Sequence, residues 1–245
     1  MGLWKVVSLG GRVAQRMSLC LLGLAAMLNL GSTATMTLSL LLSLVVYAMA
    51  FGLRFAVGFI MLLFIHELGH LVASRIVGLR ATTPLFIPFV GAVISLNKPP
   101  INAKMEANVA IGGPAIGLLS ALLCLAAYLW TDSILLLVLA YTACLLNLFN
   151  LIPCDPLDGG RIAAAISPHM WWVGSIVIGI VFFYTYNFFI FIILIFSMVR
   201  LWRGEDAGTH YYNLSISQRV KVAWWYFGLL TILGVLTLHI VELLR

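Results

Sequence analysis

Long apolar segments separated by short polar ones run along most of this chain. A helix needs about 20 predominantly apolar residues to cross a bilayer. Five segments reach or approach that length: Thr35–Leu53, Phe55–Val77, Val109–Trp130, Ser133–Ile152 and Val222–Leu244. Together with two further apolar segments, they predict an all-α polytopic membrane protein with six or more transmembrane helices.

The two further segments each allow two interpretations. Met17–Leu30 follows three positive charges and has the form of a signal peptide, but residues 32–34 make a poor cleavage site, which favours an uncleaved first helix. Trp171–Val199 is too long for one straight span and has Asn187 in its middle, so it forms one tilted helix or a hairpin. The hairpin is favoured, because it places the basic residues of the loop at 200–221 on the same side as the other basic loops.

A segment near the middle of the chain breaks the helical pattern. Residues 81–100 are rich in β-branched and aromatic side chains and include Pro84 and Pro88. Proline is confined to the edges of sheets, and irregular backbone at membrane depth persists only where protein or water satisfies its polar groups. The segment therefore predicts a short membrane-associated β-hairpin or edge strand.

Composition places the whole chain in a lipid bilayer. Of its 245 residues, 63% are hydrophobic and 9% are charged, against about 25% charged in a soluble domain. We expect one membrane-embedded domain over residues 1–245. The net charge of +6 does not indicate nucleic-acid binding, because the Lys and Arg residues gather in loops, as they do on the cytoplasmic side of membrane proteins. Four scattered cysteines without a C-x-x-C pair do not indicate a disulfide framework.

One apolar segment contains a motif of residues that can bind a metal and move protons. Within Phe55–Val77 stand His66, Glu67 and His70, in the order His-Glu-Leu-Gly-His. Residues four apart share a helix face, so both imidazoles can reach one metal ion, with Glu67 pointing towards the water that the metal activates. This is the H-E-x-x-H arrangement of zinc peptidases.

The membrane setting strengthens the metal interpretation. The alternative is three polar side chains that hydrogen-bond within a helix bundle. However, an ionisable residue near the bilayer centre costs on the order of 2.5–3.5 kcal/mol and is rare without a function. A divalent cation offsets that cost directly, so a metal site is favoured.

A catalytic zinc site takes three protein ligands and leaves a fourth position open. The third ligand must come from elsewhere in the chain. After the apolar segment ending at Ile152, two prolines and two glycines break the helix, and two carboxylates follow, Asp155 and Asp158. By residue type, either can bind zinc.

At this point the chain resembles the site-2 protease family of intramembrane metalloproteases. The H-E-L-G-H motif in one helix and the sequence N-L-I-P-C-D-P-L-D-G-G at 150–160 carry the resemblance. It implies that the aspartate of the L-D-G motif, Asp158, is the third ligand, and that Asp155 is a solvated loop residue. Residues 110–115 are similar to the A-G-P turn that opens the next helix in the family, and residues 89–94 to the strand beside the active site.

The resemblance covers residues 55–165 firmly. It implies a catalytic core of about 55–165 with flanking helices at 17–53 and 170–245, and we expect no PDZ or CBS domain. It also implies a multi-pass protein of a bacterial plasma membrane, whose active-site loops face the cytoplasm according to the charge bias. The substrates would be membrane-anchored proteins, cut within or next to their transmembrane segments in regulated proteolysis or remnant signal-peptide clearance. The alternatives are a zinc enzyme that uses the same ligands for non-proteolytic hydrolysis, and a membrane cation transporter or scaffold without protease activity. The oligomeric state stays open.

The motif chemistry and the resemblance together imply the expected roles, with Asp158 assigned by the resemblance. One Zn²⁺ per chain is held by His66, His70 and Asp158, and Glu67 is the general base, which later returns the proton to the leaving amine. The resemblance implies that Asn150 faces the substrate, where its amide can steady an oxyanion; the other interpretation is a helix-breaking Asn that satisfies nearby carbonyl groups. Asn147 is expected to bond a neighbouring helix.

An unwound substrate segment needs a partner for its backbone. We expect it to pair by β-augmentation with the strand Phe89, Val90, Gly91, Ala92 and Val93.

Two residue types indicate how the helices lie and pack. Gly69 and Gly113 are expected to allow close helix packing. Tryptophans at segment ends are expected in an interfacial aromatic belt: Trp171, Trp172, Trp202, Trp224 and Trp225.

Overall fold

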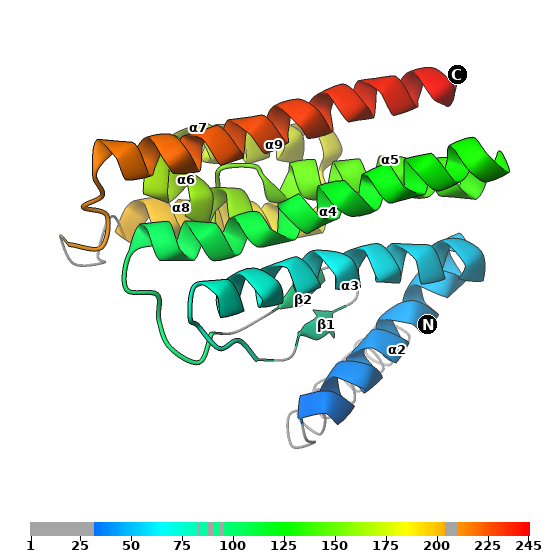
Figure 1. Cartoon of the computed structure of the whole chain (residues 1–245), viewed down its shortest axis with the longest axis horizontal. Coiled ribbons are helices and arrows are strands. Elements are labelled where there is room, and N and C mark those ends of the chain that lie inside the picture. Colours follow the sequence, from blue (N-terminus) through cyan, green and yellow to red (C-terminus); the bar gives the residue numbers. More distant parts are fainter. Residues whose placement is uncertain (1–31, 83, 88–90, 94–95, 204–209) are drawn as a thin grey trace, which may run out of the picture.

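The computed structural model of the protein describes residues 32–82, 84–87, 91–93, 96–203 and 210–245. It is mostly helical (Figure 1). The predicted first apolar segment, Met17–Leu30, and the strand residues Phe89 and Val90 lie outside the described residues. The helices and strands are α2 (Ser32–Phe51), α3 (Leu53–Ile76), β1 (Leu85–Ile87), β2 (Gly91–Val93), α4 (Ala103–Thr131), α5 (Ile134–Asn150), α6 (Asp158–Ile166), α7 (Met170–Thr185), α8 (Phe188–Arg203) and α9 (Ile216–Leu243).

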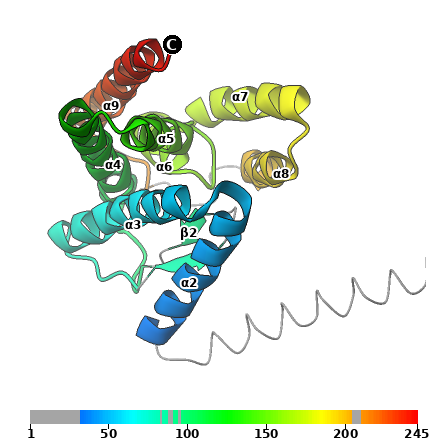
Figure 2. The same cartoon turned by 90° about the vertical axis from the view of Figure 1, so that its right-hand side faces the viewer.

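The first two described helices form a hairpin that turns at one residue. Gly52 joins α2 to α3 with φ of 86°, a backbone conformation that a side chain disfavours. Strands β1 and β2 pair antiparallel, with Phe86 opposite Ala92. This small sheet lies beside α2, where the Phe86 backbone N–H donates to Ser39 Oγ at 3.1 Å, and β2 also contacts α3 (Figure 2).

Helices α3, α4 and α5 pack together as the centre of the protein, with α6 and α9 against α4. Gly69 of α3 lies directly against the backbone of Gly112 in α4, and a methyl group added at either residue would overlap the other helix. The expectation that glycines allow close packing here is confirmed. Without a hydrophobic drive between helices in lipid, such close contact is a main source of association.

Two helices begin earlier than the hydropathy predicted. Helix α4 begins at Ala103 rather than Val109, because Asn102 caps it by accepting the Met105 backbone N–H. Helix α9 begins at Ile216, where Ser215 and Gln218 form a capping box. The expectation that residues 110–115 open a helix is wrong: Pro114 lies inside α4.

Residues 170–203 form two helices rather than one. Helix α7 ends at Thr185, Tyr186 has φ of 48°, and Asn187 Oδ1 accepts the Phe189 backbone N–H at 2.8 Å. Helix α8 then returns along α7. The predicted hairpin at Asn187 is confirmed. Each helix has 16 residues, or about 24 Å at 1.5 Å per residue.

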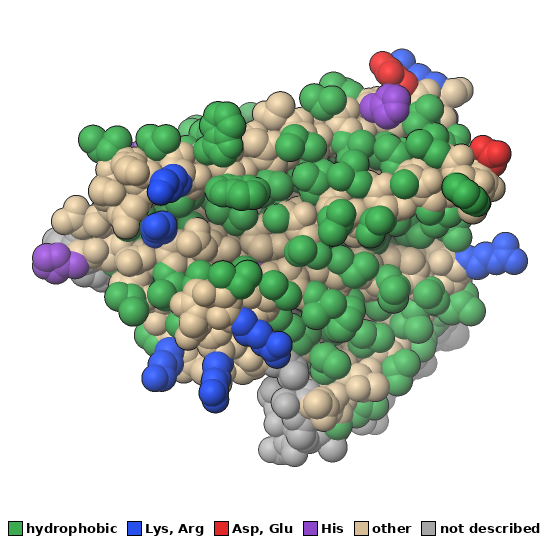
Figure 3. All heavy atoms as spheres, viewed as in Figure 1, with side chains coloured by type: hydrophobic (Ala, Val, Ile, Leu, Met, Phe, Trp, Pro, Cys, Tyr) green, Lys and Arg blue, Asp and Glu red, His purple; other side chains and the backbone are tan. Residues whose placement is uncertain are grey.

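The surface is that of a membrane protein. Within the described residues, four helices are long and apolar enough to cross a bilayer: Thr33–Phe51, Leu53–Ile76, Ala103–Thr131 and Ile216–Leu243. Hydrophobic side chains cover the middle of the face in Figure 3, and Lys and Arg gather mainly towards one end. Trp172, Trp202, Trp224 and Trp225 are exposed, but Trp171 is only 6% exposed. Its assignment to an interfacial belt is therefore wrong, because it packs inside the protein.

Candidate metal centre

The two motif histidines lie on one face of α3, at its crossing with α4. Their Nε2 atoms are 3.1 Å apart, and both side chains are buried. Gly113 of α4 is packed against both imidazole rings, so that a methyl group at this position would overlap them. A helix face with a glycine opposite it therefore leaves room for two imidazoles and little else.

The third candidate ligand reaches the same point from a distant part of the sequence. The chain leaves α5 at Leu151, makes a compact loop, and enters α6 at Asp158. Asp158 Oδ2 lies 3.2 Å from the Nε2 atoms of both histidines, and its side chain is 13% exposed. The other carboxylate of this loop, Asp155, is not part of the cluster; its Oδ2 lies 4.0 Å from Arg200 Nε. The structure thus brings together the three predicted ligands.

The outer nitrogen of each imidazole has a hydrogen-bond acceptor. His70 Nδ1 lies 2.9 Å from the Val109 carbonyl oxygen, and His66 Nδ1 lies 2.9 Å from Asn147 Oδ1. A carbonyl oxygen only accepts, so both Nδ1 atoms carry the proton, and in a neutral ring Nε2 then presents a lone pair. Such outer partners are usual for histidines that bind metals.

These contacts test whether the residues fit a metal ion. Two imidazole lone pairs and a carboxylate oxygen converge at 3.1–3.2 Å, and three such groups repel one another unless a cation lies among them. The centre of their triangle is about 1.8 Å from each atom. Zinc binds nitrogen and oxygen at about 2.0–2.2 Å, so these three atoms are spaced closely enough to hold one zinc ion together. The donor set fits zinc.

The segment that carries Asp158 is held at both ends by buried side chains. Tyr226 of α9 donates its hydroxyl proton to the Leu151 carbonyl at 2.7 Å, and Trp171 of α7 donates its indole N–H to the Gly160 carbonyl at 2.8 Å. Gly159 is packed against the backbone of Leu151, where no side chain fits. Sequence reasoning missed Tyr226 and Trp171, because their partners are backbone groups far away in the chain.

The other predicted site residues lie at different places. Glu67 is 6% exposed, and its carboxylate interacts electrostatically with both histidines and with Asp158. Asn150 donates from Nδ2 to the Leu146 carbonyl of its own helix at 3.1 Å. Asn147 contacts a neighbouring helix, as expected, but its partner is His66, a role that sequence reasoning missed. Of the predicted pairing strand, the backbone of Gly91, Ala92 and Val93 lies in β2.

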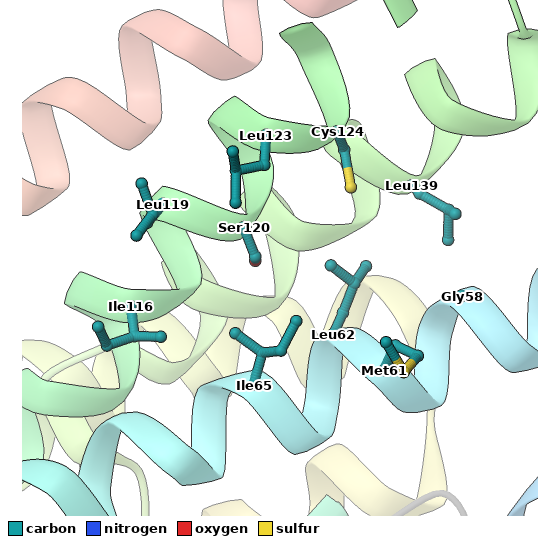
Figure 4. A pocket seen from close by; sticks show the side chains of 10 residues that line it. All are labelled: Gly58, Met61, Leu62, Ile65, Ile116, Leu119, Ser120, Leu123, Cys124 and Leu139. Atoms are coloured by element: carbon teal, nitrogen blue, oxygen red, sulfur yellow. The ribbon is translucent and has the colours of Figure 1, made fainter. Parts of the chain in front are cut away.

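An apolar pocket of about 300 Å³ lies away from these groups, between α3, α4 and α5 (Figure 4). Side chains such as Met61, Leu62 and Leu123 line it, and Ser120 donates its hydroxyl proton to the Gly117 carbonyl at 2.7 Å. The pocket has no ligand set for a metal and is separate from the cluster of histidines.

Comparisons with known proteins found a matching family and similar proteins. Residues 54–133 match the family described as Peptidase family M50. Over 107 residues the chain is 36% identical to "Zinc metalloprotease MJ0392" of Methanocaldococcus jannaschii, which covers 42% of this chain and 31% of that protein. Over 135 residues it is 35% identical to "Putative zinc metalloprotease Rip3" of Mycobacterium tuberculosis, covering 51% and 33%. These matches span about a third of the length of either relative.

A solved structure was also found to be similar. It is the "Site-2 Protease from Methanocaldococcus jannaschii", with a TM-score of 0.45 and 22% sequence identity, covering 78% of this chain and 86% of that one.

Proposed function

Because the chain belongs to the site-2 protease family of membrane metallopeptidases, peptidase family M50, we propose that it is an intramembrane zinc endopeptidase. It would hydrolyse peptide bonds within or next to the transmembrane segments of membrane-anchored proteins, in regulated proteolysis or in clearance of remnant signal peptides. One observation carries the proposal: two imidazole nitrogens with their outer N–H groups engaged and one carboxylate converge among apolar helices.

The proposed roles divide between holding the metal and moving a proton. His66, His70 and Asp158 hold one zinc ion per chain. Zinc in such a site supplies Lewis acidity, which polarises a carbonyl group and lowers the pKa of a water molecule to about 7. The Glu67 carboxylate takes a proton from the attacking water and returns it to the leaving amine. The close helix packing around the histidines excludes bulk water and keeps these groups in place.

The cleavage experiment separates metal binding from proton transfer. Purified Glu67→Gln is compared with wild type for cleavage of a single-span reporter in liposomes and for zinc content. We expect zinc to stay at one equivalent and cleavage to be abolished, whereas His66→Ala loses both. Glu106→Gln is the control and should cleave normally, because this carboxylate lies in the first turn of α4 and accepts from Tyr211 instead. Cleavage by Glu67→Gln would contradict the proposed mechanism.

Strand β2 is proposed to pair with the substrate. It contacts α3, the helix that carries the histidines, and in the described part of the sheet only β1 pairs with it. Val93→Pro removes a backbone N–H, as does Val90→Pro, and each should weaken cleavage while zinc content stays unchanged. Val93→Thr, which keeps the N–H, is the matched control. Unaffected cleavage by both proline variants would reject the pairing.

Asn150 is proposed to face the substrate, although its amide now donates to a carbonyl of its own helix. Its amide would have to leave the Leu146 carbonyl in order to steady an oxyanion. Removal of an oxyanion donor lowers kcat about 10²–10³-fold, so Asn150→Ala should do so with zinc unchanged. A normal kcat would favour the other interpretation, in which this amide only satisfies its own helix.

The proposed membrane arrangement follows from the distribution of charge. The chain is an integral membrane protein, and we place the ends of α3 and the beginnings of α4 and α9 on the cytoplasmic side. Basic residues lie in or next to those segments: Arg75, Arg80, Lys98, Lys104, Arg219 and Lys221. Arg161 of α6 is close to them, because its Nε lies 3.9 Å from Glu106 Oε1 in the first turn of α4. With α5 and the α7–α8 hairpin, this arrangement makes six or more membrane helices in a single domain whose core is 55–165. The histidines then lie about 9–15 Å from the cytoplasmic end of α3, at 1.5 Å per residue.

A further inference from the structure

The amide group of Asn147 is enclosed by its own helix, α5, and by α3 and α4. It lies in the last turn of α5, is only 1% exposed, and faces both α3 and α4. On the α4 side Gly117 is opposite it, and a methyl group there would overlap all three atoms of the amide. Burial of an amide in an apolar interior is costly unless its polar atoms are bonded, so this residue needs specific partners.

Both polar atoms of the amide have partners, and these fix its orientation. Asn147 Nδ2 donates to the Ala143 carbonyl at 2.7 Å, one turn earlier in α5. A carbonyl cannot donate in return, so the amide cannot be flipped, and Oδ1 must face His66 Nδ1 at 2.9 Å. The imidazole N–H of His66 is therefore held on Nδ1.

His66 has an alternative that this contact excludes. A neutral imidazole exists in two tautomers, and the second would place the proton on Nε2, which faces His70 and Asp158. Such a ring could donate to the carboxylate but could not bind a metal through Nε2, the nitrogen that faces the cluster. Similarly, rotation of the ring would turn Nε2 away from the cluster. Both states compete with zinc binding, and the Asn147 oxygen disfavours both.

We propose that Asn147 is a positioning residue, which holds His66 in the tautomer and orientation that zinc binding requires. His70 depends on a backbone carbonyl for the same purpose, so of the two histidines only His66 has an outer partner that a substitution can remove. The proposal rests on the proposed function through the metal site alone. Asn147 also belongs to the helix that leads to Asp158, and the position of that helix is thereby linked to the His66 ring.

The test measures zinc affinity of the full-length protein in detergent, by competition with a chelator and without any substrate. Asn147→Leu removes the acceptor at similar volume, whereas Asn147→Asp keeps an oxygen that accepts from His66 Nδ1 in either protonation state. Loss of an outer partner of a metal ligand typically weakens metal binding 10–100-fold. We expect that loss in Asn147→Leu and a change of less than about tenfold in Asn147→Asp.

Thr142→Val is the matched control. Thr142 lies in the same helix and also donates to the carbonyl one turn earlier, Val138, at 2.7 Å, but it is not part of the cluster. The zinc affinity of Thr142→Val should equal that of wild type. The absorption spectrum of Co²⁺-substituted protein gives a second readout, since a changed histidine ligand alters it in Asn147→Leu and not in Thr142→Val.

The outcomes are distinct. Wild-type zinc affinity in a folded Asn147→Leu protein overturns the proposal, and so does an equal loss in the Leu and Asp variants, which would show a purely structural role. If Asn147→Leu does not fold, Asn147→Asp decides: a loss of tenfold or more overturns the proposal. Zinc binding that depends on Asn147 in a protein that cleaves nothing would uphold this inference and reject the proposed function.

Discussion

A single methyl group at Gly113 should disable the metal centre while it favours the helix. Gly113 lies inside α4, where replacement of glycine by alanine normally stabilises a helix by about 0.8–1.0 kcal/mol. Here the added Cβ would lie 2.7 Å from His66 Nε2 and closer still to His70 Nε2. The substitution Gly113→Ala is therefore expected to stabilise helix α4 and to weaken metal binding by the two histidines.

The magnitude follows from the contact distances. Ordinary contact of a Cβ with another heavy atom begins at 3.4 Å, so His66 Nε2 must retreat by about 0.7 Å, or α3 must move away from α4. Zinc sites tolerate deviations of about 0.2 Å in the metal–ligand distance. The required shift is several times larger. Moving α3 away from α4 would also break the close backbone contact between Gly69 and Gly112, one residue away. Gly113→Ala should thus weaken zinc binding by tenfold or more, which is the scale found for disturbed metal ligands.

The assay pairs zinc affinity with thermal unfolding of the zinc-free protein. Gly228→Ala is the control, because it makes the same change inside helix α9. Apart from the backbone of its own helix, no atom of the described residues lies within 4 Å of the new methyl group. Gly228→Ala should keep wild-type zinc affinity. Gly113→Ala that binds zinc as tightly as wild type and cleaves at the same rate would refute the geometry described for the site.

Three further predictions concern the rest of the protein. Tyr226→Phe leaves the buried Leu151 carbonyl without its donor, at a cost of about 1–3 kcal/mol, so the Tm of this variant should fall by several degrees. Tyr184→Phe, at an 88% exposed position, should leave Tm unchanged. Equal Tm values for wild type and both variants would contradict this role of Tyr226. Burial raises the pKa of the Cys154 thiol to about 12, so that only about one molecule in 10⁴ carries the thiolate at pH 8. With Cys20, Cys124 and Cys144 replaced by alanine, maleimide should label the protein only after denaturation, and fast labelling of the folded protein would disprove the burial. A chelator should abolish cleavage and added Zn²⁺ should restore it, while cleavage that persists in a metal-free protein would exclude the proposed chemistry.

Hydropathy predicted most of the helices but not their polar ends. The bounds of the predicted apolar segments agree within a few residues with those of α2, α3, α5 and the α7–α8 hairpin. Helices α4 and α9 extend past their apolar parts because Asn102 and Ser215 cap them, and a hydropathy pattern does not register caps. Trp171 illustrates the same limit for single side chains. Its place at a segment end suggested the membrane interface, but its contacts with Gly160 and the Arg200 guanidinium are made by folding.

The sequence supplied the candidate ligands and could not supply their outer partners. The spacing of His66 and His70 places both imidazoles on one face of a helix, so local structure alone brings them together. Asp155 and Asp158, in contrast, were equal candidates for the third ligand by residue type. Folding separates them, because the compact loop after α5 turns Asp158 inward and leaves Asp155 near Arg200. The partners of the imidazoles, Asn147 and the Val109 carbonyl, come from α5 and α4. No motif marks a backbone carbonyl, so only the packing of helices identifies it.

X-ray absorption at the zinc edge tests most directly whether α3 and the distant loop before α6 hold one zinc ion between them. For the zinc-loaded protein we expect one ion per chain with two imidazole ligands and oxygen ligands at about 2.0–2.2 Å. Asp158→Ala should change this spectrum and weaken binding. A spectrum with a different number of imidazoles, or one that Asp158→Ala leaves unaltered, would contradict the claim.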